Sequence, residues 1–120
     1  MATNECKRLA DICLFEGDSL PLQYVTFTDD AAAAVDISTA VCTITFRAAG
    51  ASTDVLSYTL AGDTEVTVSG AGNNVLNLEV GATDMSGLVP GTYTITWDVA
   101  LSTTWTRSAV QRLDITARVF

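Results

Sequence analysis

The chain contains no histidine among its 120 residues, and this removes the side chain that most often serves as a general base. Neither a Ser-His-Asp nor a Cys-His nucleophile arrangement can be built within one subunit. The only cysteines are Cys6, Cys13 and Cys42, so a zinc site is disfavoured as well. The sequence therefore predicts a protein that is not an enzyme and has no catalytic residues, no cofactor and no bound metal.

Basic residues are scarce too, since six Lys and Arg stand against fourteen Asp and Glu, for a formal net charge of −8. Nucleic acid is not an expected partner, because phosphate binding needs a cationic face. No apolar run approaches the ~20 residues that span a bilayer, so no membrane contact is expected. The start, MATNECKRLADICLF, has acidic residues and no signal-peptide core, so we expect no secretion signal and synthesis in a cytoplasm.

Apolar residues make up 48% of the chain, and they recur at every second position in several short segments. In LVPGTYTITWDV, residues 88–99, Tyr93, Ile95 and Trp97 share one face, which is the period of a half-buried strand. Turn-forming clusters such as EGDS, AAGASTD and GAGNN separate these segments. The pattern predicts one all-β domain, a sandwich of about seven to nine short strands with little helix.

Three local features give further expectations. The alanine-rich segment 28–39 is expected to be a loop or one turn, because short isolated helices are marginal. Segments 55–60 and 64–69 are expected to form a hairpin. In the last strand, about residues 104–119, a β-bulge near Gln111 is one explanation of an apparent break in phase.

The strand expected at 20–28 has apolar side chains on both faces. Leu22 and Tyr24 lie on one face, whereas Val25 and Phe27 lie on the other. The sequence leaves open which of the two faces the core.

The last strand also supplies the candidate interaction surface, Trp105, Arg107, Arg112 and Arg118. The arginines are interpreted either as solvated, outward side chains or as an ionic contact to an acidic neighbouring subunit. Trp105 lies among threonines and serines, so it is either an outward platform for a sugar ring or an inward residue that caps the sandwich. Its direction discriminates between these two interpretations.

The stretch LVPGTY resembles the corner of immunoglobulin-like and fibronectin-like sandwiches, in which a tyrosine near the start of a strand bonds back to the backbone. The corner residues are Leu88, Pro90, Gly91 and Tyr93. The resemblance implies a structural role for Tyr93.

Three stretches resemble small immunoglobulin-like domains of tailed bacteriophages and prophages, including the N-terminal domain of upper baseplate proteins. They are FEGDSLPL, DDAAAAVDISTAVCTITFRA, and LVPGTYTITWDV followed by a long last strand. The resemblance implies an immunoglobulin-like antiparallel β-sandwich. It also implies a structural virion protein, as a baseplate, tail, connector or capsid-decorating subunit. Such a subunit would act in many copies or as a homo-oligomer, by packing against other virion proteins.

Residues 1–11 are polar and fall outside the sandwich pattern of residues 12–120. We expect them to form either an N-terminal arm that orders on a partner or a simple disordered end. The alternative function is a carbohydrate-binding or adhesive module at a virion or cell surface. Trp105 and the loops around Asp29 and Gly72 would then contact the glycan.

Overall fold

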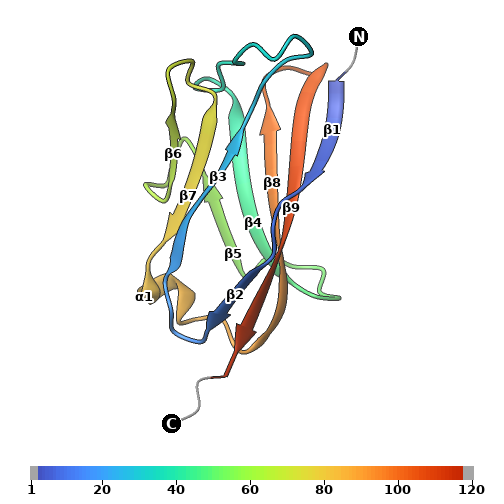
Figure 1. Ribbon diagram of the computed structural model, residues 1–120. Coiled ribbons are helices and arrows are strands. Elements are labelled where there is room, and N and C mark those ends of the chain that lie inside the picture. The colour runs from blue at the N-terminus through green and yellow to red at the C-terminus, as the bar shows by residue number, and fades with distance from the viewer. Residues whose placement is uncertain (1–2, 118–120) are drawn as a thin grey trace.

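The computed structural model describes residues 3–117, which form nine strands and one short helix (Figure 1). In chain order they are β1 (Thr3–Arg8), β2 (Ile12–Phe15), β3 (Leu20–Thr26), β4 (Val41–Ala48), β5 (Leu56–Thr59), β6 (Val66–Ser69), β7 (Val75–Val80), α1 (Ala82–Met85), β8 (Gly91–Ala100) and β9 (Trp105–Thr116). The predicted all-β fold with little helix is confirmed.

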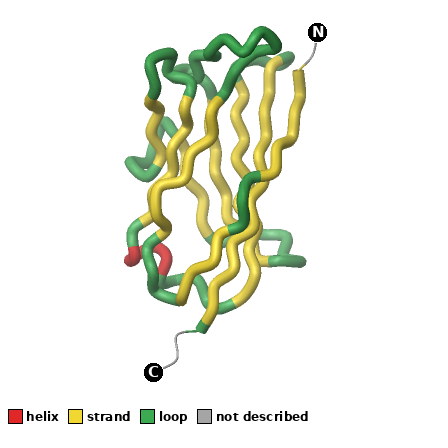
Figure 2. Tube along the Cα trace, in the orientation of Figure 1, coloured by secondary structure: helices red, strands yellow, loops and turns green. Residues whose placement is uncertain are grey.

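The strands form two sheets that pack face to face (Figure 2). The large sheet has the order β1-β9-β8-β4-β5, and β2 also pairs with β9. The small sheet has the order β3-β7-β6. β1 and β2 run parallel to β9, whereas the other pairs are antiparallel. The chain is thus a two-layer sandwich with its core between the layers.

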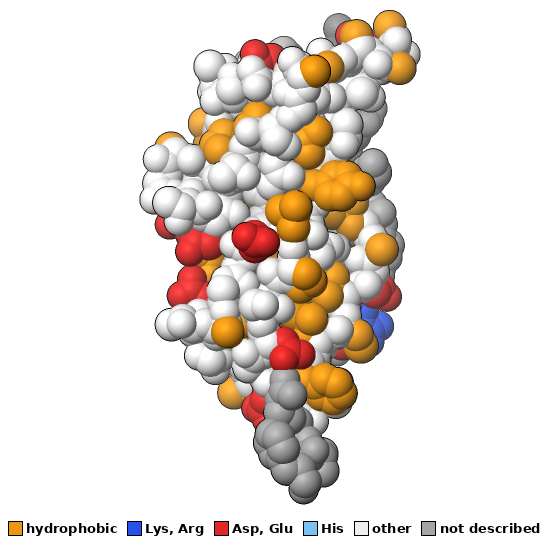
Figure 3. Space-filling view, turned by 60° about the vertical axis from the view of Figure 1, so that its left-hand side comes forward, with side chains coloured by type: hydrophobic (Ala, Val, Ile, Leu, Met, Phe, Trp, Pro, Cys, Tyr) orange, Lys and Arg blue, Asp and Glu red, His pale blue; other side chains and the backbone are white. Residues whose placement is uncertain are grey.

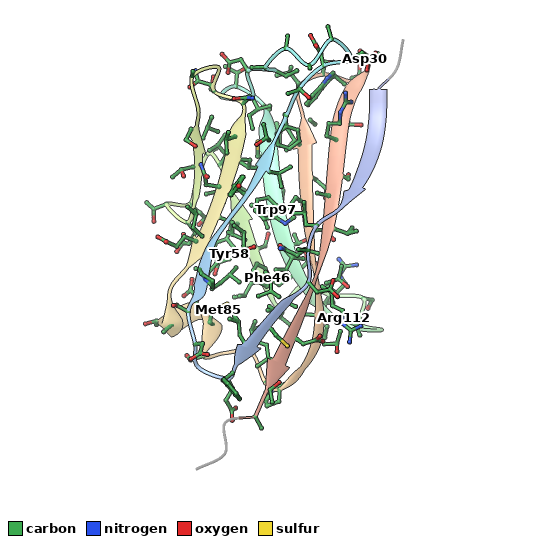
Figure 4. The ribbon with its side chains drawn as sticks, viewed as in Figure 1. Asp30, Phe46, Tyr58, Met85, Trp97 and Arg112 are labelled. Atoms are coloured by element: carbon green, nitrogen blue, oxygen red, sulfur yellow. The ribbon has the colours of Figure 1, made fainter. Side chains whose placement is uncertain are left out.

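The core consists of the inward residues of the alternating strands. In β8 the inward side chains of Tyr93, Ile95 and Trp97 are buried, and the last two are fully inaccessible. Phe46 of β4 meets Tyr58 of β5 edge-on, with ring centroids 6.2 Å apart, and Figure 4 shows both rings between the layers. Strict alternation therefore follows from burial of one face of each strand.

Val25 of β3 and Phe27, directly after the strand, point into the core, whereas Leu22 and Tyr24 lie on the outer face of the small sheet. Its pairing with β7 shifts register between Leu20 and Gln23. Pro21 lies within that irregularity on an edge strand, where its missing N–H costs no ladder bond. The structure thus settles which face of this segment is the core face.

The loop expected at 28–39 is confirmed, and the carboxylate of Asp29 organises it by accepting bonds from the N–H groups of Ala31 and Ala33, both at 2.9 Å. The hairpin expected from 55–60 and 64–69 is wrong. β5 pairs with β4 in the large sheet, whereas β6 pairs with β7 in the small one. The connection between them crosses from one layer to the other.

The bulge suggested near Gln111 is also wrong. The register of β8 with β9 is unbroken from Gly91 opposite Ile115 to Ala100 opposite Thr106. Gln111 and Arg107 point inward with their apolar neighbours, and two polar residues on the core face produced the apparent break.

β1 pairs with the N-terminal half of β9, from Thr3 opposite Trp105 to Arg8 opposite Val110. β2 pairs with the C-terminal half of β9, beginning with Ile12 opposite Leu113. Part of the expected arm, residues 1–11, therefore extends the large sheet. The division into an arm and a domain of residues 12–120 stays a prediction.

Candidate interaction surface

The arginines of the last strand do not form one surface. Arg107 faces the core and is 8% exposed, so its interpretation as a solvated outward residue is wrong. Arg112 lies on the outer face of the large sheet, where its Nε lies 3.1 Å from a carboxylate oxygen of Asp114 (Figure 4). Arg118 lies outside the described residues. Arg107 and Arg112 differ in parity along β9, and this places them on opposite faces.

Trp105 points inward and is half-buried against the core. Its ring lies 6.2 Å from that of Phe27 at an interplanar angle of 60°. The guanidinium carbon of Arg107 lies 4.5 Å from the centroid of the Trp105 ring, within the range of a cation–π contact. Phe27 and Arg107 thus contact the ring, and its inward direction is the one that removes the best platform for a sugar.

The loops named for the glycan alternative contact each other at one end of the sandwich. A Cβ added to Gly72 would lie 2.5 Å from the Cβ of Ala34, so only glycine fits this approach. The N–H of Ile37 donates to the carbonyl of Asn73 at 2.9 Å. A bond from Ser38 lowers the pKa of the neighbouring Asp36 carboxyl. These polar groups therefore hold the loops in shape.

The corner residues lie between α1 and β8. The hydroxyl of Tyr93 donates to the carbonyl of Val89 at 2.6 Å, and the ring is buried. Leu88 is buried beside it, whereas Pro90 and Gly91 are exposed. Gly91 has a φ of +153°, which residues with a Cβ rarely adopt. The corner fixes the entry of the chain into β8.

Removing this hydroxyl with Tyr93→Phe is expected to lower the free energy of unfolding by about 1–2 kcal/mol, because the carbonyl of Val89 loses its partner in a part-buried setting. Urea denaturation followed by circular dichroism measures the change. Tyr24→Phe is the matched control, since Tyr24 is 63% exposed and should change stability by under about 0.5 kcal/mol. Equal stability of Tyr93→Phe and the wild type would contradict a stabilising corner.

The outer face of the large sheet is rich in threonine and poor in free charge. A shallow hollow of about 370 Å³ lies against the β4–β5 loop and includes Thr45, Thr94 and Asp98 in its lining. Arg47 at its rim is paired with Asp54 at 2.8 Å. The hollow offers threonine hydroxyl groups and the carboxylate of Asp98.

Two groups with raised pKa values lie in the core, away from any such hollow. Burial raises the pKa of the Cys42 thiol to about 11, and burial together with a 2.8 Å bond to Asp84 raises the pKa of Tyr58. In residues 3–117 no group of three or more metal-ligating side chains occurs, and no helix is long and apolar enough to cross a membrane.

The most exposed large aromatic side chain of the described chain is Tyr24, on the edge strand of the small sheet. Leu22, two residues earlier on the same face, is 54% exposed, and Phe15 at the end of β2 is 52% exposed. Figure 3 shows hydrophobic side chains in a broken diagonal band down this side of the molecule. The sequence already indicated an exposed apolar surface here, because both faces of segment 20–28 are apolar and only one of them can face the core.

No family model and no curated protein matches the chain. CopC from Methylosinus trichosporium OB3b is similar in structure, with 12% identity, a TM-score of 0.54, and coverage of 93% of this chain and 89% of that one. The titin M3 domain shows 16% identity, a TM-score of 0.40 and 91% coverage of both chains. AggA, the major subunit of an Escherichia coli fimbria, shows 16% identity, a TM-score of 0.40, and 88% and 90% coverage. At these identities the likeness concerns the fold alone, which is an immunoglobulin-like β-sandwich.

Proposed function

We propose that the chain is a non-enzymatic packing module that binds other proteins, and that it serves as a structural subunit of a tailed-phage virion. The observation that carries the packing role is the edge strand β3, which exposes Leu22 and Tyr24 on the outer face of its sheet. Outward positions of antiparallel sheets are ordinarily polar. Exposed apolar groups on a sheet edge are instead typical of a contact with another chain.

The resemblance of three sequence stretches to phage immunoglobulin-like domains supports the virion role. A subunit of a particle needs surfaces that pack repeatedly, and it needs no catalytic group. The glycan-binding alternative loses its main support, because Trp105 points inward and its ring contacts Phe27 and Arg107. The proposal therefore rests on protein contacts.

The test is to purify phage particles whose genome encodes the chain and to quantify the chain by peptide mass spectrometry across a density gradient. We expect it to sediment with the particles at a fixed ratio to the major capsid protein and to survive a high-salt wash. Recovery of the chain only in the soluble fraction of the lysate would overturn the virion role.

Complementation with Tyr24→Lys links that result to the β3 surface, since a charge at the edge should reduce incorporation. Val41→Lys is the matched control. Val41 is 70% exposed on the outer face of the large sheet, and its replacement makes the same change in charge. Equal incorporation of both variants would move the contact away from β3.

A further inference from the structure

The edges of the two sheets differ in how far they are protected. β5 and β6, the edges on one flank, have four residues each. On the other flank the large sheet ends in β1 and β2, which are separated at residues 9–11. β3 has seven residues, of which residues 23–26 pair with β7 in unbroken register, and it exposes Leu22 and Tyr24. Short or broken edges resist pairing with another chain, and in β3 Pro21 and the register shift protect only the start of the strand.

The backbone of β3 has bonding groups on its free side. The N–H of Phe27 donates to the carbonyl of Asn74 on the β7 side at 2.8 Å. Because backbone groups of a strand alternate in direction, those of Val25 also face β7, whereas those of Tyr24 and Thr26 face away from the sheet. Within residues 3–117 no strand pairs with this side of β3, so the outward groups form a free edge.

β7 itself has no free side, because β6 pairs along its other edge. The N–H of Glu79 donates to the carbonyl of Glu65 at 3.0 Å, and Thr67 lies opposite Asn77. The small sheet can therefore grow by a strand only beyond β3 or beyond the shorter β6.

β3 also has no charged side chains of its own that would oppose pairing with another strand. Residues 19–28 contain no Asp, Glu, Lys or Arg, although the whole chain carries a net charge of −8. Pro21 and the register shift interrupt only the start of the strand, before Gln23. The part that remains regular presents Tyr24 in a strand without charged residues, and Glu79 of the neighbouring strand β7 is the exposed carboxylate on the same face.

We propose that β3 pairs antiparallel with β3 of a second copy of this chain across a two-fold axis. The small sheets of the two copies then join into one continuous sheet. This inference rests on the proposed packing function and names the first partner of that surface. Leu22 and Tyr24 of each copy lie on the same outer face as those of the other, so the apolar side chains pack across the new strand pair.

A second copy fits this edge because the pairing is self-complementary. A two-fold axis places the outward groups of one β3 opposite the same groups of the other, as an isologous contact requires. The neutral run also allows two acidic chains to approach without placing charges within the paired strands. A contact limited to one strand pair and four apolar side chains is small against the ~1,200–2,000 Å² of stable interfaces. The dimer is therefore weak alone and gains strength in a multi-copy assembly.

The salt dependence separates this contact from an ionic one. Two copies that each carry −8 repel each other, so salt should strengthen a neutral edge contact by screening. A contact between Arg112 and acidic groups of a neighbour would weaken in salt instead.

The experiment is sedimentation velocity on the full chain from about 1 µM to about 1 mM, the range in which weak dimers form, at low and high salt. We expect a monomer–dimer equilibrium that shifts toward dimer as salt rises. Tyr24→Lys should weaken dimerisation by about 10-fold or more, equivalent to about 1.4 kcal/mol. Val41→Lys should leave it unchanged.

Thr26→Pro provides a second variant that leaves the outer face of the sheet uncharged. It removes an N–H that faces the free edge, and proline is tolerated on edge strands. It should therefore weaken dimerisation while circular dichroism and the melting temperature show that the fold is retained. This keeps the test informative if Tyr24→Lys does not fold.

A monomer at all concentrations would overturn the self-pairing, as would a dimer that all three variants leave intact. A dimer that weakens in salt would also overturn it. These results are independent of incorporation into particles. A chain that is monomeric but still enters particles through Tyr24 would overturn the proposed homodimer and would agree with the proposed function.

Discussion

Trp97→Ala is expected to lower the free energy of unfolding by about 4 kcal/mol, a large part of the ~5–15 kcal/mol that stabilises a domain of this kind. Trp97 is fully inaccessible and lies in the middle of β8, where it contributes the largest inaccessible side chain of the core (Figure 4). Truncation would leave a void that the two strands beside β8 cannot close. Urea denaturation, followed by far-UV circular dichroism, measures the loss.

Two replacements make this result interpretable. Trp97→Phe keeps a ring in the core and removes Nε1, a buried donor without a hydrogen-bond partner in the described structure, so it should cost clearly less than alanine. Thr94→Ala changes an exposed residue of the same strand and should stay within about 0.5 kcal/mol of the wild type. If Trp97→Ala unfolded at the urea concentration of the wild type, its central place in the core would be refuted.

Gln111→Ala should cost about 2–3 kcal/mol, because it removes a buried side chain together with two hydrogen bonds. Gln111 is 3% exposed, and its Nε2 donates to the carbonyl of Ala10 and to Oε1 of Gln23, both at 3.1 Å. The amide therefore ties β9 to the segment between β1 and β2 and to β3 in the other sheet. Thermal unfolding measures the loss, and limited proteolysis near Ala10 should accelerate as well.

Gln111→Met separates the two contributions, since it retains most of the volume and loses both bonds. It should recover part of the stability but not the resistance to proteolysis near Ala10. Gln23→Ala removes only one acceptor at a partly exposed position and should cost less than either change at Gln111. Unchanged proteolysis in Gln111→Met would show that the N-terminal segment is held by other contacts.

The sequence predicted the strands that obey simple alternation. β4 and β8 lie inside the large sheet with one face on the core, so every second residue from Cys42 to Phe46 and from Tyr93 to Val99 is buried. Local side-chain pattern was sufficient there. Sheet membership was not predictable in this way, because strand pairing joins distant segments: β5 and β6 are neighbours in sequence and belong to different layers.

The candidate surface was harder to predict, since its exposure depends on residues far away in the chain. The sequence indicated that Trp105 could be an exposed platform for a sugar, because its neighbours in the chain are polar. In the structure Phe27, almost eighty positions earlier, packs against its ring. Gln111 and Arg107 made the alternation of β9 hard to recognise, because both polar side chains lie on the core face. The Nε2 of Gln111 donates to the carbonyl of Ala10, and Arg107 packs over the Trp105 ring. Tyr24 was visible as an apolar residue, but only the packing of Val25 and Phe27 shows that it must face outward.

The parallel course of β1, β2 and β9 has a mechanical consequence. β1 begins near one end of a molecule 51 Å long, and β9 finishes near the other (Figure 1). Tension applied between the two ends of the chain would therefore act along these adjacent strands. Their ladder bonds would be loaded together in shear instead of opening one after another, as they would in a hairpin pulled at its open end. A subunit joined to neighbours through its two ends would bear load along its long axis.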